Sequence, residues 1–411
     1  MKIAKTVILS LFFGMVFGAI FRLFHLNATF INLSLDWLAL ISDIFIKLIK
    51  MIVPILIFTT LSVGIANLGN NSAGLGRLFY KSFIIFLLSS CLSLSIGWII
   101  VDILQPGVNI LAHIDITKYT DNSTLKIPPH SLLNFIKELI PENITLAFAE
   151  SNIIQIVVFS ILFGLALAQI PLEQRNLIQT FMNGIMNTMF TICKLIMKLV
   201  PLVVFASISH IIIKNGFAVL YSYLIFILGY YFALLLVWMV LYLIARKYIG
   251  KKINILIKNI FRALSLSFAT SSSEVAYPSI FEELDKFGIK KDISSFVLSM
   301  GYSFNMIGSM VYFSFAMIFL TQTFGIHLDF LDKAYMFFVL LITSKGIAGV
   351  PRASIMVIAS VLIIFHIPQS AILLLIPIDA FADMGRSATN VFANTITSVI
   401  VDKWEQKADK V

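Results

Sequence analysis

Five polar side chains stand at helical spacing in the last apolar stretch of the chain, between Ile372 and Val401. They are separated by steps of four, three, four and four positions. Side chains at this spacing lie on one face of an α-helix. The remaining faces consist mainly of Ile, Leu, Ala and Val. The pattern predicts a continuous polar stripe on an otherwise apolar helix, formed by Asp379, Asp383, Arg386, Asn390 and Asn394.

The stripe carries the groups that an acidic amino acid requires. The planar guanidinium of Arg386 can bind a carboxylate through two hydrogen bonds. Asp383, one turn away, can accept a protonated amino group, and the amide of Asn390 can both donate to and accept from an α-carboxylate. These groups fit glutamate or aspartate. The alternative is a purely structural ion pair between Asp383 and Arg386, which leaves Asp379 and the asparagines unexplained.

The composition places this helix in a membrane. Of the 411 residues, 59% are hydrophobic and 12% are charged, whereas soluble domains average roughly 25% charged residues. A charged side chain at the centre of a bilayer costs about 2.5–3.5 kcal/mol on insertion scales. Three such residues within eight positions therefore require a partner or water. The stripe is predicted to line an internal site of a membrane transporter, rather than to face lipid.

The net charge of +9 is a topological signal. Six bases and no acids lie between positions 246 and 262, and the positive-inside rule places such a segment in a cytoplasmic loop. A polyanion-binding patch is the alternative, and the flanking spans disfavour nucleic acid as a partner. Lys2 and Lys5 precede the first apolar run, which is expected to be an uncleaved span. Cys91 and Cys193 lie in apolar runs and are expected to be inert packing residues.

The apolar runs before the basic segment predict six spans. A long polar segment at 106–131 follows the third run, and three crossings from a cytoplasmic N-terminus place it outside the cell. The stretch 141–143 should interrupt the fourth run, and Pro201 should kink the fifth. The runs cover about 5–24, 36–67, 79–105, 132–170, 176–213 and 217–245.

Two nine-residue segments, Thr270–Pro278 and Thr343–Pro351, match in length and in their ends. Each follows a short apolar arm and precedes a long apolar run that carries polar residues. Pro278 precedes Asn305 by 27 residues, and Pro351 precedes Asp379 by 28. The repetition predicts two re-entrant hairpins, each followed by a span, which is typical of a binding site at the membrane midplane. Chance similarity of two turns is the alternative.

The tips of these hairpins carry further polar groups. The serines at 271–273 would begin a helical arm whose free N–H groups point at an anion, although such hydroxyls also bond their own backbone. The turn at 346–351 is expected to open and close as a lid. Asn305–Ser309 is expected to be an unwound segment whose carbonyl groups bind a cation or substrate, or else a glycine in a tightly packed helix.

These motifs together resemble the dicarboxylate/amino acid:cation symporter family, which contains glutamate transporter homologues. The strongest matches are Asp-Met-Gly-Arg at 383–386 and Gly-Ile-Ala-Gly-Val-Pro at 346–351. Segments at 51–54 and 152–159 also look like family segments, so the likeness spans most of the chain. The Ser-Ser-Ser-Glu tip and Asn394 are similar to the bacterial proton/glutamate symporters.

The resemblance implies an all-α membrane protein with eight transmembrane helices, two re-entrant helical hairpins and inverted repeats. It also implies a homotrimer in the bacterial cytoplasmic membrane, with both termini cytoplasmic. Residues 1–75 and 132–215 would form a trimerising scaffold, and residues 76–105 and 216–405 a transport domain that moves as an elevator. The C-terminal elements would be hairpin 1 at 255–282, span 7 at 290–323, hairpin 2 at 333–365 and span 8 at 370–403.

Roles carried over by position are likewise implied by the resemblance. Arg386 would bind the side-chain carboxylate of the substrate, and Asp383 its amino group. Family members that carry C4-dicarboxylates generally lack the acid found at Asp383, which favours an amino acid. The other implied substrate-binding residues are Asn390, Ser309, Ser272, Ser273, Val350, Gly349 and Ser387. Those implied in proton or cation coupling are Glu274, Asp379, Asn305, Asn394, Ser344, Ser89 and Ser90.

Departures from the family pattern concern the coupling ion. Ile307 and Asn394 stand where sodium-coupled members have acids, and a family Tyr with two hydroxyl residues becomes Phe86, Ser89 and Ser90. Sodium prefers anionic or carbonyl oxygen as its ligand. The resemblance therefore implies coupling to protons rather than sodium.

Glu274 and Asp379 are the candidate proton carriers. Arg352 adds a charge at a hairpin position that the family usually gives to Gly, and Ile307 departs even from the proton-coupled branch. No resident cofactor or metal is expected, only a co-transported cation. A sodium-coupled carrier, one for neutral amino acids or C4-dicarboxylates, and an ion channel remain alternatives. An enzyme is disfavoured because none of the six His stands beside an HExxH or GxSG pattern.

Overall fold

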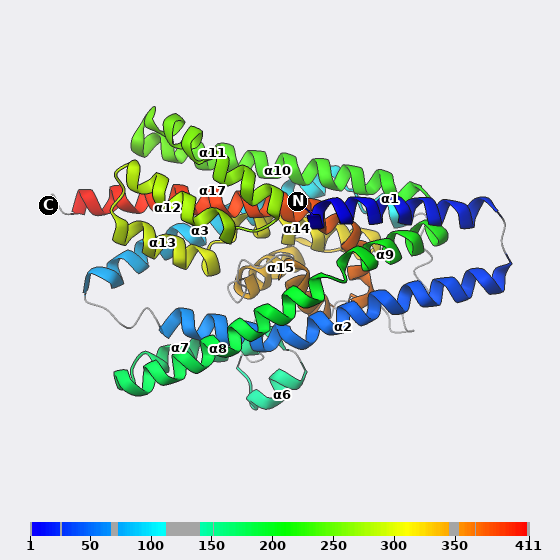
Figure 1. Cartoon of the computed structure of the whole chain (residues 1–411), viewed down its shortest axis with the longest axis horizontal. Coiled ribbons are helices and arrows are strands. Elements are labelled where there is room, and N and C mark those ends of the chain that lie inside the picture. The colour runs from blue at the N-terminus through cyan, green and yellow to red at the C-terminus, as the bar shows by residue number, and fades with distance from the viewer. Residues whose placement is uncertain are drawn as a thin grey trace.

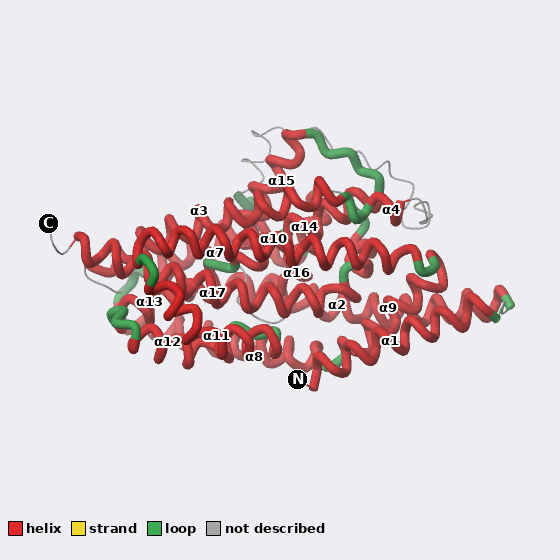
Figure 2. Tube along the Cα trace, turned by 90° about the horizontal axis from the view of Figure 1, so that it is seen from above, coloured by secondary structure: helices red, strands yellow, loops and turns green. Residues whose placement is uncertain are grey.

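The computed structural model describes residues 2–24, 27–66, 73–111, 140–150, 152–344, 353–365 and 367–408. In these ranges all regular structure is helical and no strand occurs. The long helices run mostly along the long axis of the molecule (Figures 1 and 2). The all-α class predicted from the sequence is confirmed for this part of the chain.

The first half of the described chain contains six long helices and two short ones. The fifth predicted span is divided at Lys198–Leu199, just before Pro201, and the fourth is divided around Asn152. Asn143 and Asn152 cap the helices that follow them, because their side chains accept hydrogen bonds from backbone N–H groups. The helices are α1 (Lys2–Leu23), α2 (Ala28–Ala66), α3 (Ala73–Leu104), α4 (Val108–Leu111), α6 (Ile144–Ala149), α7 (Ile153–Leu167), α8 (Leu172–Met197) and α9 (Val200–Asn215).

The prediction of a cytoplasmic loop at 246–262 is wrong, because most of these residues are helical. Helix α10 (Ala218–Ile249) ends at Gly250, whose φ of 61° suits only glycine well. Helix α11 (Lys252–Thr270) begins two residues later. The bases therefore lie mostly on two helices, where lysine and arginine are good helix formers, and only the turn between them is irregular.

The described residues in the ranges of the two predicted hairpins and of spans 7 and 8 are mostly helical, with bounds that differ by several residues. The tip of the second hairpin, at 345–352, lies outside the described residues, and with it Gly349, Val350 and Arg352. The elements after α11 are η3 (Glu274–Ala276), α12 (Tyr277–Lys286), α13 (Lys291–Phe304), α14 (Ile307–Thr323), α15 (Phe330–Thr343), α16 (Ala353–Ile364), η5 (Gln369–Leu374) and α17 (Ile376–Ala408).

Three segments among the described residues are long and apolar enough to cross a membrane: Arg77–Leu104, Val219–Ile249 and Lys291–Thr323. Shorter apolar helices occur at Leu9–Leu23, Pro54–Ala66, Gln155–Leu167 and Val200–Lys214. Apolar helices of this kind fit a chain whose solvent is largely lipid.

The helices pack in two groups. In the first, α1 packs on α9, and α2 packs on α7, α8 and α9. In the second, α17 packs on α10, α11, α13 and α14, and α3 packs on α10 and α14. Fewer contacts join the groups, for example between α9 and α17. Helix α17, which carries the polar stripe, is therefore surrounded by helices of the second group (Figure 1).

Candidate functional site

The polar stripe of α17 faces the interior of the protein. Asp379 and Asn394 are fully buried, and Asp383, Arg386 and Asn390 are at most 5% exposed. The opposite expectation, a stripe turned toward lipid, would have argued against an internal site. Burial of three ionised groups in one helix instead requires that they compensate one another or bind a ligand.

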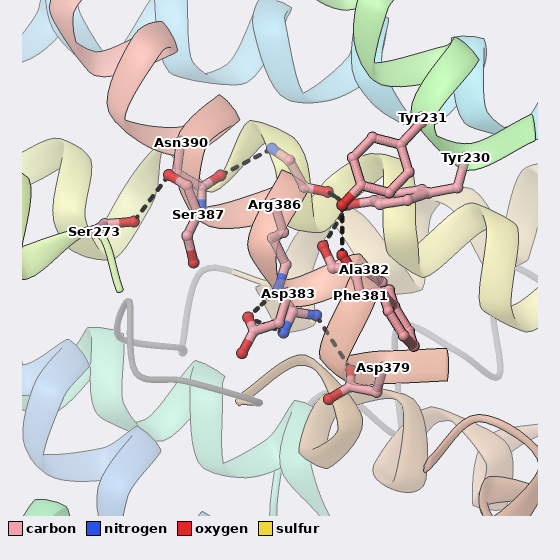
Figure 3. A network of polar contacts seen from close by, with 11 residues as sticks. Tyr230, Tyr231, Ser273, Asp379, Phe381, Ala382, Asp383, Arg386, Ser387 and Asn390 are labelled. Carbon is pink, nitrogen blue, oxygen red and sulfur yellow. Dashed lines mark hydrogen bonds and ion pairs between the residues drawn. The ribbon is translucent and has the colours of Figure 1, made fainter. Parts of the chain in front are cut away.

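Arg386 is held by two acids of its own helix (Figure 3). Its Nε donates to Asp383 Oδ1 at 3.0 Å, and its Nη2 also pairs with this oxygen. Its Nη1 lies 3.6 Å from Asp379 Oδ1. The guanidinium stacks over the ring of Tyr312, 5.0 Å from the ring centroid, which adds a cation–π contact on one face.

The intrahelical ion pair that the sequence offered as an alternative is therefore present. The guanidinium of Arg386 is already paired with acids of its own helix in this structure. One of its nitrogens, Nη1, nevertheless makes no hydrogen bond to any described residue. The guanidinium thus has a remaining donor for a ligand, and its acidic partners lie one and two turns away on the same face.

The helix of span 7 is broken beside Arg386. Helix α13 ends at Phe304, and Asn305 and Met306 have ψ angles of 65° and 59°, outside the helical region. The unwound segment predicted around Asn305 is present. The N–H of Gly308 in the next turn donates to Asn390 Oδ1 at 2.8 Å. A Cβ on Gly308 would lie 2.5 Å from the backbone oxygen of Arg386, so only glycine permits this approach.

The tip of hairpin 1, between α11 and α12, contacts α17 next to Arg386. The hydroxyl of Ser273 donates to the backbone oxygen of Ser387 at 3.3 Å. The N–H of Ser272 bonds to the oxygen of Ser267 and helps to end α11. Ser271 adopts the left-handed conformation at that end, with φ of 52°. The tip therefore touches α17 through Ser273, while the backbone N–H of Ser272 is used within the hairpin.

A network of amides and phenols lies on the stripe two turns further on. Asn305 Nδ2 donates to Asn394 Oδ1 at 2.7 Å, and Asn394 Nδ2 donates to the hydroxyl of Tyr277 at 3.1 Å. Tyr302 donates to Glu274 of the hairpin 1 tip. This network joins α12, α13 and α17. Of the two acids predicted to carry protons, Glu274 is exposed and Asp379 is buried.

Three predicted coupling residues are buried serines elsewhere. Ser89 and Ser90 lie on α3, where the hydroxyl of Ser90 donates to the oxygen of Phe86 at 2.7 Å. Ser344 follows α15, and its hydroxyl donates to the oxygen of Leu341 at 2.8 Å. These bonds lie within single helical segments rather than at Arg386.

The family model described as "Sodium:dicarboxylate symporter family" matches residues 3–404. The chain belongs to this family. It is therefore a membrane symporter, and the family carries small acidic substrates. The resemblance stated from the motifs is confirmed.

Relatives of two substrate classes match over nearly the whole length of the symporter. It is 35% identical over 387 residues to the "Proton/glutamate-aspartate symporter" of Escherichia coli (strain K12), covering 92% of this chain and 88% of that protein. It is 34% identical to the "Proton/sodium-glutamate symport protein" of Geobacillus stearothermophilus, covering 98% and 94%. It is 33% identical to the "C4-dicarboxylate transport protein" of Rhizobium leguminosarum, covering 90% and 84%.

Sequence reasoning missed the tyrosines that frame the site of the symporter. Tyr312 stacks against the guanidinium of Arg386. It stands three residues after Ser309, so helical periodicity could have placed it on the same face of span 7. The hydroxyl of Tyr230 donates to Gly308 at 3.2 Å, and that of Tyr231 donates to Phe381 at 2.7 Å. Two adjacent tyrosines within an apolar span could have indicated this role, because buried hydroxyls need hydrogen-bond partners.

No group of three or more His, Cys, Asp or Glu among the described residues is arranged to hold a metal ion. Ile307 is fully buried, so an apolar side chain that offers no oxygen to a cation fills this position. Ser309 Oγ and Asn305 Oδ1 are buried and make no hydrogen bond to a described residue. These two oxygens, together with Nη1 of Arg386, have capacity left to bind a substrate or a cation.

Proposed function

We propose that this symporter imports glutamate or aspartate across the cytoplasmic membrane together with protons. The observation that carries the proposal is the buried pair of Asp383 and Arg386 on α17. An ion pair in a low-dielectric site is costly to break, since each separated charge loses its partner. A substrate that supplies a replacement for each partner avoids this cost.

An acidic amino acid supplies both replacements. Its side-chain carboxylate takes the guanidinium of Arg386, and its ammonium group takes the carboxylate of Asp383. The α-carboxylate then lies near Asn390 and the hydroxyl of Ser309, which has no hydrogen-bond partner among the described residues. A C4-dicarboxylate would take Arg386 and leave Asp383 buried without a cation. The charges of the site therefore favour an amino acid over a dicarboxylate.

The same charge count supports coupling to a cation. Asp379, Asp383 and Arg386 together carry −1 when all are ionised, and an acidic amino acid adds a further −1. A buried site with an excess of two negative charges is unstable without co-transported positive charge. Protons suit this chain because Ile307 and Asn394 offer no carboxylate to sodium. Asp379, buried beside Arg386, and Glu274 are the proposed carriers.

The two packing groups support an elevator mechanism. The group of α1, α2, α7, α8 and α9 would be the static scaffold at the centre of a homotrimer. The group built on α17 would carry the substrate between the two sides, with the second hairpin as its gate. Both termini would be cytoplasmic.

The test is uptake of radiolabelled glutamate into proteoliposomes with an imposed pH gradient and no sodium. We expect accumulation above the equilibrium level when the vesicle interior is alkaline, and a loss of accumulation when a protonophore collapses the gradient. A strict sodium requirement would reject proton coupling while leaving the amino acid assignment intact. Saturable uptake of succinate with no uptake of glutamate or aspartate would reject the substrate assignment, and single-channel currents without accumulation would indicate a channel.

A further inference from the structure

A groove lies on the side of α17 opposite the charged site. It has a volume of about 300 Å³ and is formed by α10, α11 and α17, three helices that pack on one another. This volume is at the lower end of ligand pockets, roughly 300–1,000 Å³. Its lining includes Leu234 and Trp238 from α10, Phe261 and Phe268 from α11, and Ala388 and Thr389 from α17.

The lining is suited to hydrocarbon. Most of its side chains are aliphatic or aromatic, and three of its polar side chains are already engaged in hydrogen bonds. Trp238 Nε1 donates to Thr389 Oγ1 at 2.8 Å, and the hydroxyl of Tyr231 donates to the oxygen of Phe381. A polar ligand would find few donors or acceptors here, so the groove selects an apolar occupant.

The groove opens on a surface that a bilayer would cover. Leu235 and Phe261 line it and are 65% and 66% exposed. Exposed side chains of this size and number on membrane-spanning helices lie against acyl chains. The span that contains α10 is one of those long and apolar enough to cross the membrane.

Two cations of α11 lie close to the groove residues in the sequence. Lys258 lies one turn before Phe261, and Arg262 lies one turn before Ser265, which also lines the groove. Both are exposed, and neither forms an ion pair with a described residue. Side chains on a helix point toward its N-terminus, so both extend toward the basic turn at the membrane edge.

We propose that this groove binds an anionic phospholipid, with one acyl chain between α10, α11 and α17 and its phosphate at Lys258 and Arg262. Basic clusters at the end of a membrane-spanning helix attract anionic headgroups, with each cation giving roughly a fivefold preference. Lys258 and Arg262 each lie one turn before a groove residue of α11, so one lipid molecule reaches both the groove and the cations. This site is separate from the proposed substrate site and does not depend on its function.

The test uses Trp238 as the reporter, since it lines the groove and is half-buried. Trp37, Trp98 and Trp404 are replaced by Phe, and the protein is placed in vesicles of equal phosphatidylethanolamine and phosphatidylglycerol. Only one of the two lipids carries bromine on its acyl chains, which quenches tryptophan on contact. We expect the ratio of phosphatidylglycerol to phosphatidylethanolamine at Trp238 to exceed that of the bulk mixture by about 5- to 25-fold, for one or both cations engaged.

Two charge variants complete the test. Lys258→Gln with Arg262→Gln should abolish the enrichment, whereas Lys251→Gln with Lys252→Gln, which removes the same charge at the start of the same helix, should retain most of it. Equal quenching by the two lipids, or equal loss in both variants, would overturn the proposal. If the tryptophan substitutions prevent folding, native mass spectrometry of the unsubstituted protein should show retained phosphatidylglycerol that Lys258→Gln with Arg262→Gln loses. Its absence would also overturn the proposal.

Discussion

Helix α17 carries two ion clusters that differ in almost every physical respect. The cluster in its middle consists of Arg386, Asp383 and Asp379, all from one helix and nearly all inaccessible to solvent. The cluster at its end joins Glu405 to Arg77 and Lys81 of α3, and the side chain of Arg77 is 47% exposed. Lys81 Nζ lies 2.8 Å from Glu405 Oε1.

One cluster forms ion pairs between two helices, whereas the other forms its ion pairs within a single helix. The Glu405 cluster links α17 to α3, and the partial exposure of its cations to solvent limits both its cost and its gain. The ion pairs of the Arg386 cluster lie within one helix, and they put three charges where insertion is most costly. Stability alone does not account for the middle cluster. Its cost is explained if the same groups bind a charged substrate, as proposed above.

Removing the arginine of each cluster should give the largest contrast. Arg386→Ala should lower uptake of acidic amino acids at least about 100-fold, because charge-assisted hydrogen bonds to a carboxylate contribute roughly 1.5–3 kcal/mol and the acids of the site lose their counter-charge as well. Arg77→Ala, the matched control, should lower uptake less than about twofold. Initial rates in proteoliposomes at equal protein content measure both.

The control has a second arm in case Arg386→Ala does not fold. Arg386→Lys keeps the charge and loses the planar pair of donors, so uptake should still fall about tenfold. Folding of each variant is checked by size-exclusion chromatography and circular dichroism. Near-normal uptake by folded Arg386→Ala would show that the middle cluster is structural, like the one at the helix end.

Replacement of Asp383 should lower uptake less than replacement of Arg386 does. In Asp383→Asn the partner for a substrate ammonium is gone, but Arg386 still has Asp379. We expect uptake of glutamate and aspartate to fall about 10- to 50-fold, as for the loss of a charged hydrogen bond. Competition by succinate should be retained or increased, because succinate has no amino group. An equal loss for all three ligands would indicate that Asp383 only positions Arg386.

The sequence predicts the stripe on α17 because helical periodicity is readable wherever polar residues interrupt an apolar run. It also predicts the break at Asn305, since an amide followed by a glycine and a hydroxyl is unusual in an apolar span. The order of the hairpins and spans follows from the repeated turn segments. These features depend on residues close together in sequence.

What the sequence did not predict depends on contacts between distant segments or on competition between partners. Tyr312 and Tyr230 meet the site only because α14 and α10 pack on α17. Whether the guanidinium of Arg386 contacts solvent, a ligand or Asp383 depends on how deeply it is buried, and a sequence pattern does not measure burial. The basic segment after Arg246 is mostly helical because lysine and arginine are good helix formers, and the number of charges alone does not distinguish a helix from a loop.

The end cluster should give the smallest effect, and one that depends on pH. Burial of Glu405 opposes its ionisation, but hydrogen bonds from Lys81 and Arg77 outweigh this and hold the pKa of Glu405 below its ordinary value. A group with a lowered pKa in the folded state stabilises above its ordinary pKa, near 4.3, and this stabilisation is lost as the pH falls through the folded value. Glu405→Gln should therefore unfold about 1–3 °C lower than the parent protein at pH 7.

As the pH falls below about 4 the difference between the two proteins should shrink, and it should vanish once the pH lies below the folded pKa of Glu405, where this group is protonated in both states. Glu283→Gln is the matched control, since Glu283 pairs with the exposed Lys286 at 2.8 Å within one helix, and such a pair contributes only a few tenths of a kcal/mol. Thermal unfolding followed by tryptophan fluorescence at both pH values measures the difference. A loss in Glu405→Gln that is equal at both pH values would mean that shape or packing, rather than charge, joins α17 to α3. Uptake should stay within about twofold of normal, since this cluster binds helices and not substrate.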